Sequence, residues 1–299
     1  MSKRKVAIIT DASSDLPPEL VEKHKITILP ILINFESKSY KSEGIEKGIT
    51  WDEYYSLVDK EIPTTAIPGP GVFLKAFEEA LTVADTVIGF FISEKMSGTF
   101  NTAQSVVKQF LDDKDISLYD TKVTCSSLGL MALEAARLAT EGKSKEEVVK
   151  KVEEWLPDLN LRGIMNTLDN LARAGRISKV KKFLADILKF KPVCGYVDGE
   201  VHIYGQLRAD DELIIKQMKK FGVEALQNMH QDNKTLFINH TRWPEAAEEI
   251  AKYIEKHNPS NKEIIIQETG PLTSFFTGRK LLTMGYIGKF DPDWLLKTK

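Results

Sequence analysis

VAIITDASSD, residues 6–15, joins a short apolar run to a polar turn near the start of the chain. The apolar run at residues 6–9 is typical of a buried strand, and residues 10–15 are typical of the loop that follows one. The sequence then predicts a helix that opens at Asp15, with Pro17 in its first turn, where the missing N–H of proline costs little. This strand–loop–helix order is the first unit of an α/β fold.

The same alternation continues through the first half of the chain. Apolar runs at residues 26–35, 86–92 and 116–119 predict further strands. Capping boxes at Thr50 and Ser144 each predict the start of a helix, and the second of these helices ends before Pro157. Helical patterns also cover residues 72–81, 99–110 and 128–139. Strands that alternate with helices predict a parallel sheet with both faces covered.

The second half of the chain has a different pattern. Residues 192–197 and 200–204 flank the turn Asp198-Gly199 and predict a hairpin. The same half contains three further predicted strands, at residues 162–166, 236–240 and 264–267. It also contains two predicted helices, at residues 211–229 and 244–257. We therefore predict a two-domain α/β protein, with a Rossmann-like parallel-sheet domain over residues 1–157 and an α+β domain over residues 158–299.

Composition excludes several classes of function. Lys plus Arg total 41 against 43 Asp plus Glu, for a net charge of -2, which argues against a general nucleic-acid binder. Cys125 and Cys194 form no C-x-x-C pair and the five histidines are scattered, so no metal site is expected and a reducing cytosol is the natural compartment. No run approaches the roughly 18 apolar residues of a membrane span, and the N-terminus lacks the core of a signal peptide. We expect a cytoplasmic protein without integral membrane contact.

Small hydroxyl residues gather in three loops of the first half, at residues 10–15, 63–71 and 93–99. Ligands of a doubly wound sheet bind beyond the carboxyl ends of its strands. In the third loop Ser97, Gly98 and Thr99 open a helix, whose free N–H groups suit an anion. One such loop is more often a simple helix cap. Three of them favour a shared polar site, and because none contains a histidine to activate a serine, the site is expected to bind rather than to catalyse.

Several segments resemble, in order, motifs of the DegV family of bacterial fatty-acid-binding proteins. The segments are TDASSDLP (residues 10–17), PTTAIPGPG (63–71), ISEKMSGTF (92–100), LARAGRIS (171–178) and HTRWPEA (240–246). The resemblance spans nearly the whole chain. It implies that a long-chain fatty acid lies in an apolar tunnel, with its carboxylate in a polar pocket near the domain junction. It also implies a carrier that presents the acid to a separate fatty acid kinase, for acyl-phosphate formation in phospholipid synthesis, and that has no catalytic residue or cofactor of its own.

The resemblance assigns site residues as well. Thr65 and Ser97 match the hydroxyls that hold the carboxylate. Other residues that match the ligand pocket are Ser93, Gly98, Thr99, Glu268 and Thr269. Arg208, together with Arg173 and Arg176, matches positions where the family would place cations near the kinase or the phosphoryl group.

One departure from the family pattern bears on the ligand. Where many members read THTGPG, this chain reads QETGPL at residues 267–272, so Glu268 replaces a histidine that helps to bind the carboxylate. An ionised glutamate would repel a carboxylate, so Glu268 is protonated, points away, or faces a different head group. Two alternatives therefore stay open. One is a hydrolase or phosphotransferase that uses Ser97 or Ser13, with Asp11 as a metal ligand, and the other is a regulatory module with an altered ligand.

Apolar side chains for a tunnel are plentiful, although aromatic residues at helical spacing more often belong to an ordinary core. The candidates are Phe73, Phe77, Phe90, Phe91, Leu130, Phe183, Phe275 and Phe276.

Overall fold

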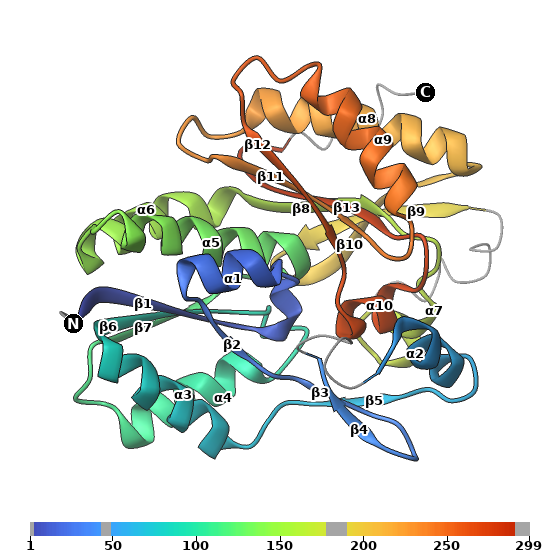
Figure 1. Ribbon diagram of the computed structural model, residues 1–299. Helices are drawn as coiled ribbons and strands as arrows, with labels where there is room; N and C mark the ends of the chain where they lie inside the picture. Colours follow the sequence, from blue (N-terminus) through green and yellow to red (C-terminus); the bar gives the residue numbers. More distant parts are fainter. Residues whose placement is uncertain (1–2, 43–48, 178–189, 291–299) are drawn as a thin grey trace.

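Two sheets separated by a layer of helices form the framework of the computed structural model, which describes residues 3–42, 49–177 and 190–290 (Figure 1). The first sheet is parallel and has the order β2-β1-β6-β7. Its strands span Thr27–Leu29, Arg4–Asp11, Ala84–Phe91 and Ile116–Asp120. Helices α3 (Pro70–Val83) and α4 (Thr99–Phe110) cover one face, and α1 (Pro18–His24) and α5 (Cys125–Thr140) cover the other. This arrangement confirms the predicted parallel sheet with both faces covered.

The second sheet is mixed and has the order β10-β9-β8-β13-β11-β12. In that order its strands span Glu200–Leu207, Lys191–Val197, Leu159–Ile164, Leu282–Ile287, Thr235–His240 and Glu263–Glu268. Only the pair β11–β12 is parallel. Helices α8 (Asp211–Asn228) and α9 (Pro244–Glu255) cover the outer face (Figure 1). The predicted hairpin is β9–β10, and the predicted α+β pattern is confirmed.

Helix α5 lies between the two sheets. Every residue from Cys125 to Ala136 is buried, as expected of a helix with protein on all sides. Leu128 and Leu130 share one core cluster with Ile8 of β1 and Phe237 of β11. Helix α6 (Lys145–Trp155) packs beside it and is followed by the 3-10 turn Leu156–Asp158 and β8. The chain thus passes from the first sheet to the second near residue 157, and the division into two domains at that point stays a prediction.

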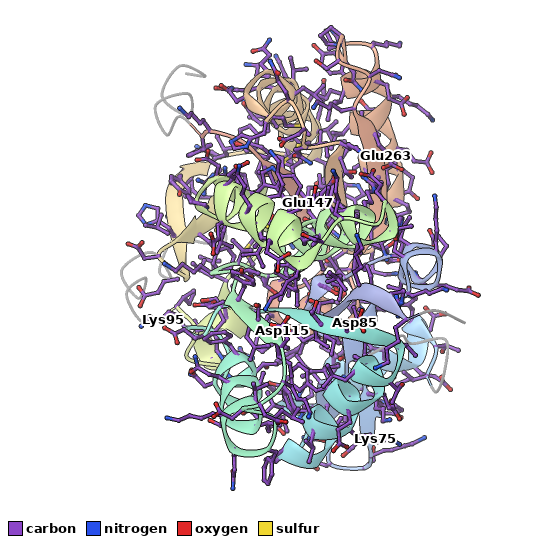
Figure 2. All side chains as sticks on the ribbon, turned by 90° about the vertical axis from the view of Figure 1, so that its left-hand side faces the viewer. Lys75, Asp85, Lys95, Asp115, Glu147 and Glu263 are labelled. Carbon is purple, nitrogen blue, oxygen red and sulfur yellow. The ribbon has the colours of Figure 1, made fainter. Side chains whose placement is uncertain are left out.

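Short elements gather where the strands of the first sheet end. A three-stranded sheet of order β4-β3-β5 spans Ser39–Lys41, Leu32–Asn34 and Thr64–Ala66. Helices α2 (Trp51–Val58), α7 (Asp169–Arg173) and α10 (Pro271–Thr277) lie at the same edge (Figure 1). Charged side chains point outward around the framework. Figure 2 labels six exposed examples, Lys75, Asp85, Lys95, Asp115, Glu147 and Glu263.

The first helix corrects one prediction. It begins at Pro18, not at Asp15, because Asp15 adopts the left-handed conformation with φ 47° at the end of a short 3-10 turn, Ala12–Ser14. The strand predicted at residues 162–166 is β8, which begins earlier, at Leu159. Elements β4, β5, β13, α7 and α10 lie outside the predicted set. In the part of the chain that the structure describes, no helix has the length and apolar character needed to cross a membrane.

Candidate ligand-binding site

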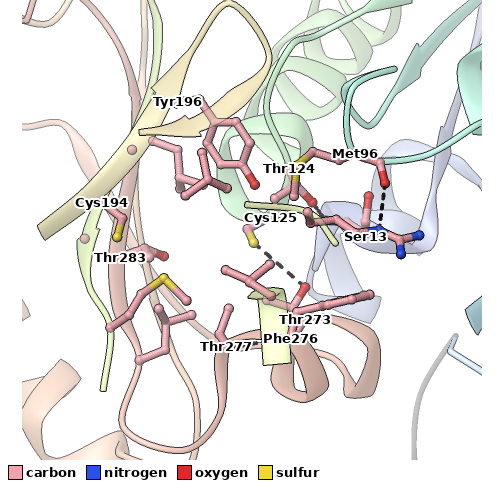
Figure 3. Close-up of a pocket in the computed structure, with 18 of the residues that line it drawn as sticks. Ser13, Met96, Thr124, Cys125, Cys194, Tyr196, Thr273, Phe276, Thr277 and Thr283 are labelled. Atoms are coloured by element: carbon pink, nitrogen blue, oxygen red, sulfur yellow. Dashed lines mark hydrogen bonds between the residues drawn. The ribbon is translucent and has the colours of Figure 1, made fainter. Parts of the chain in front are cut away.

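A mostly apolar pocket lies beyond the carboxyl ends of the first sheet, against the inner face of the second (Figure 3). It contains about 740 Å³ of empty space, part of it open to solvent. Its apolar wall comprises Ile92, Met96, Leu161, Met165, Leu171, Val201, Leu272, Phe276 and Leu281. These residues come from both halves of the chain, so the pocket depends on how the two sheets meet. Strand ends are the expected position for a ligand in such a sheet.

A second, more polar pocket adjoins the first. It is lined by Thr65, Ser97 and Gly98, and it shares a wall with the apolar pocket. The residues common to both pockets are Ile92, Met96, Arg176, Leu272 and Phe276. The structure therefore brings together four of the predicted site residues, Arg176 included, beside an apolar pocket.

The buried carboxylate of Asp11 holds two of the hydroxyl-bearing loops together. Its Oδ1 accepts hydrogen bonds from the backbone N–H (2.9 Å) and the hydroxyl of Ser13, and its Oδ2 accepts one from the N–H of Ile92 at 2.8 Å. Burial raises the pKa of Asp11, while these bonds favour its ionised form. Among the described residues, no group of three His, Cys, Asp or Glu side chains is positioned to hold a metal. Asp11 therefore has a structural role, because its hydrogen bonds fix the loop at residues 10–15 against the start of the loop at residues 93–99.

Ser97 occupies the loop between β6 and α4. Its hydroxyl lies 2.8 Å from that of Thr99, which is fully buried in the first turn of α4, and its N–H donates to the carbonyl of Ser93 at 3.0 Å. Thr99 therefore orients Ser97 without lining either pocket itself. Thr65 reaches the same pocket from β5, where it pairs with Ile33 of β3.

Ser93 has a different position from the one its motif suggests. Its buried hydroxyl donates to the carbonyl of Gly199 at 2.7 Å, in the turn between β9 and β10. Gly199 has a φ of +83°, and a Cβ on it would lie 2.6 Å from Ser93 Oγ. Ser93 lines neither pocket and instead attaches the hairpin of the second sheet to the loop of the first.

The three predicted arginines have different positions relative to the two pockets. Arg176 lines both pockets, and its Nε donates to the carbonyl of Met96 at 3.4 Å. Its guanidinium carbon lies 5.8 Å from the centre of the Phe276 ring. Arg173 and Arg208 are exposed and line neither pocket. Arg176 is thus the cation at the boundary between the polar and apolar spaces.

Glu268 and Thr269 also lie outside both pocket walls. Glu268 Oε1 accepts from the N–H of Arg242 at 3.2 Å and forms an ion pair with its Nη1 at 3.4 Å. Of the explanations considered for this glutamate, the structure shows the one in which it points away. The hydroxyl of Thr269 is buried and bonds to those of Thr241 (2.7 Å) and Ser274 (2.9 Å).

Comparison with known proteins identifies the family of this chain. A family model described as "Uncharacterised protein, DegV family" matches residues 5–289. The chain belongs to the DegV family. A DegV domain-containing protein of Caldanaerobacter subterraneus subsp. tengcongensis is 35% identical over 245 residues, which cover 79% of this chain and 85% of the relative.

Solved structures of other DegV proteins have the same fold. One, described as DegV, a fatty acid binding protein from Bacillus subtilis, aligns with a TM-score of 0.80 and 25% identity, over 96% of this chain and 100% of that one. A second, described by the fatty acid binding of a DegV family protein from Thermus thermophilus, aligns with a TM-score of 0.81 and 25% identity, over 95% and 100% of the two chains. The two-sheet architecture is therefore that of the DegV family.

Most aromatic candidates for a tunnel belong to the core of this DegV protein. Phe73, Phe77 and Phe91 fill the space between the first sheet and helices α3 and α4. Phe90 and Leu130 pack on the opposite face of that sheet, and Phe275 packs against α2, while Phe183 lies outside the described residues. Of the candidates in the described part of the chain, only Phe276 lines the pocket. The core interpretation is therefore correct for Phe73 and Phe77 of α3, whereas Phe276 of α10 contributes to the pocket.

Sequence reasoning missed the inner wall of the pocket. Tyr196 and Cys194 come from β9, and Thr283 comes from β13 (Figure 3). No local motif marks these residues. A weak signal was available in the strand glycines Gly163 and Gly195, since glycine within a strand often marks a close approach of a ligand or another chain segment.

Proposed function

We propose that this DegV-family protein binds a long-chain fatty acid, with the acyl chain in the apolar pocket and the carboxylate near Thr65 and Ser97. The observation that carries the proposal is an apolar pocket that shares five lining residues, Arg176 among them, with a more polar pocket that bears the hydroxyls of Thr65 and Ser97. The solved DegV structures described as fatty acid binding proteins support it. Because each buried CH₂ contributes about 0.8 kcal/mol, a long chain would remain bound through purification.

The electrostatics also favour an anionic head group. Arg176 offers a permanent positive charge and oriented donors beside the hydroxyls, which suits a carboxylate. Glu268 forms an ion pair with Arg242 and does not line the polar pocket, so its negative charge does not face the proposed carboxylate. A carboxylate at Ser97 would therefore meet donors and a cation.

We further propose a carrier without turnover of its own. The hydroxyl of Ser97 bonds to that of Thr99 rather than to a base, so no partner in this contact would activate it as a nucleophile. A hydrolase that used Ser13 with Asp11 as a metal ligand is disfavoured, because both carboxylate oxygens of Asp11 already accept hydrogen bonds, from the N–H and hydroxyl of Ser13 and from the N–H of Ile92. The presentation of the acid to a fatty acid kinase is part of this proposal. The exposed arginines Arg208 and Arg173 are its candidate contacts, because guanidinium groups bind oxyanions through two bonds.

The experiment is denaturing extraction of freshly purified protein, followed by mass spectrometry of the organic phase. A fatty acid in near-stoichiometric amount is expected. A protein that yields no lipid and takes up no added long-chain acid would contradict the proposal, and a regulatory module with an altered ligand would then be favoured. Ester or phosphate turnover that Asp11→Asn abolishes would instead favour the enzyme.

Ser97→Ala tests the head-group contact. The substitution removes a hydrogen bond to a charged group, which is worth about 1.5–3 kcal/mol, so the dissociation constant is expected to rise roughly tenfold or more. Titration calorimetry on delipidated protein measures it. Ser105→Ala on α4 is the matched control, because that exposed hydroxyl bonds only to the carbonyl of Asn101 in its own helix. Equal affinities for the two variants would remove Ser97 from the site.

A further inference from the structure

One hydroxyl in the apolar pocket has no hydrogen-bond partner in the described part of the chain. Thr283 lies on β13, in the middle of the second sheet, and is only 6% exposed. Its Oγ1 is buried and unpaired, although the residue lines the pocket. A buried hydroxyl is normally paired, because leaving it without a partner is costly.

Other threonines of the pocket are already satisfied by the protein. Thr273 donates to the carboxylate of Asp15 at 2.7 Å, and Thr277 donates to the carbonyl of Thr273 at 2.8 Å. Thr124 reaches the carbonyl of Ser13 at 3.4 Å. Thr283 therefore differs from its neighbours in having its donor still available.

The phenol of Tyr196 is a second hydroxyl in the same pocket as Thr283. Tyr196 of β9 lines the same pocket, and no hydrogen bond of its phenol is found among the described residues. Burial raises its pKa well above the ordinary value, so the phenol remains a neutral donor. In Figure 3 the oxygens of Tyr196 and Thr283 both turn toward the interior of the pocket.

The two hydroxyls lie beyond the head-group end of the site. Neither belongs to the wall that the apolar pocket shares with the polar one. The space around Thr283 depends on Gly163 of β8, its partner in the sheet, because a Cβ at Gly163 would lie 2.4 Å from Thr283 Cγ2. A ligand would thus meet Thr283 along its chain, not at its carboxylate.

We propose that the preferred ligand is a fatty acid that carries an oxygen function, a hydroxyl or keto group, along its acyl chain, and that Thr283 and Tyr196 hydrogen-bond to that oxygen. A plain methylene chain offers no partner to either hydroxyl, whereas an oxygen on the chain satisfies one or both. The inference rests on the proposed function and specifies its ligand class.

Delipidated protein would be titrated with octadecanoic acid and with a series of its monohydroxy derivatives, with the hydroxyl at successive positions from the middle of the chain outward. At least one isomer is expected to bind roughly two- to tenfold more tightly than the plain acid. Thr283→Val and Tyr196→Phe should each reduce that preference, measured in each variant as the ratio of the dissociation constants of the plain and the hydroxy acid. Thr283→Ser, which keeps the hydroxyl, should retain the preference.

Two results would overturn the inference and leave fatty acid binding intact. In one, plain octadecanoic acid binds as tightly as every hydroxy isomer. In the other, Thr283→Val weakens the plain and hydroxy acids equally, as expected if the hydroxyl serves only packing or a bound water. Failure of every acid to bind would overturn the proposed function and this inference together.

Discussion

Arg176 is the residue that most changes the interpretation of the site. The resemblance suggested a contact with a kinase or a phosphoryl group, which stays a prediction, and the structure adds that Arg176 lines both the polar and the apolar pocket. Arg173, three positions earlier, is exposed like Arg176 but lines neither pocket. Spacing in the sequence could not separate the two, because the turn after α7 decides which of them faces the cavity.

Arg176→Gln should therefore weaken binding of a fatty acid and leave binding of the corresponding fatty alcohol nearly unchanged. The acid loses a favourable charge interaction, while the alcohol carries no charge to lose. We expect a rise of roughly tenfold in the dissociation constant of the acid. Arg173→Gln is the control and should alter neither. If the acid and the alcohol weakened equally in Arg176→Gln, the charge of Arg176 would have no part in binding.

Asp15 couples the first loop to α10 and responds to pH. Its carboxylate accepts from the N–H of Gly270 at 2.9 Å and from the hydroxyl of Thr273 at 2.7 Å. Burial raises its pKa from 3.8 to about 7. Between these values the folded protein holds a proton that the unfolded chain has released, so the free energy of unfolding falls as the pH rises through that window.

Asp15→Asn removes this titration. The wild-type protein should lose up to about 4 kcal/mol more unfolding free energy than the variant between about pH 4 and pH 7. Asp11, whose pKa is raised in the same direction, still titrates in both proteins. Urea unfolding at several pH values measures the difference, and Asp112→Asn, at an exposed turn, serves as the control. Parallel pH profiles for the wild type and Asp15→Asn would show that Asp15 has an ordinary pKa.

At the scale of elements, the hairpin β9–β10 joins the two halves of the site. Ser93 binds the carbonyl of Gly199 at its turn, and Tyr196, Cys194 and Val201 of the same hairpin line the pocket. The position of the hairpin therefore affects the shape of the cavity.

Gly199→Ala should destabilise the fold by about 2 kcal/mol, because alanine is strained at a φ of +83° and its Cβ would contact Ser93 Oγ. Ligand affinity should fall as well, since the hairpin would shift. Gly205→Ala in β10 is the matched control, because no atom lies within 4 Å of the Cβ it would add. Equal unfolding free energies for the two variants would contradict this account of the turn.

Elements with strong local patterns could be predicted from the sequence. The capping boxes at Thr50 and Ser144 start helices as predicted, and α4 spans the predicted residues. Strand β13 was missed although it lies between β8 and β11, because its role depends on partners far away in the sequence. Helix α10 has only seven residues, too few for a periodic pattern. The hydroxyl loop at Ser97 was visible as a motif, whereas Thr283 reaches the pocket only through this sheet order.

At the scale of the whole molecule, a ligand in this pocket would link the two sheets. Ile92 and Met96 come from the first half of the chain, and Leu161 and Leu281 come from the second. Helix α5 packs against both sheets as well. The two predicted domains are therefore expected to unfold together.

Scanning calorimetry should show one transition, which moves upward when fatty acid is added to delipidated protein. At about 100 times the dissociation constant, binding adds about 2.7 kcal/mol, or an upward shift of roughly 4 °C for a chain of this size. A fatty acid methyl ester, which lacks the charge, is expected to shift the transition less. Two transitions, of which only one responds to ligand, would show that residues 1–157 and 158–299 unfold separately.

The late position of β13 also has a consequence during synthesis on the ribosome. Domains generally fold as they emerge, the N-terminal part first, and the four strands of the first sheet all lie before residue 121. The second sheet, in contrast, lacks its middle strand until residues 282–287 have been made. Until then β8 and β11 have no strand between them, and the pocket lacks Leu281 and Thr283 from its wall. The proposed ligand pocket is therefore complete only after residues 282–287 have been synthesised.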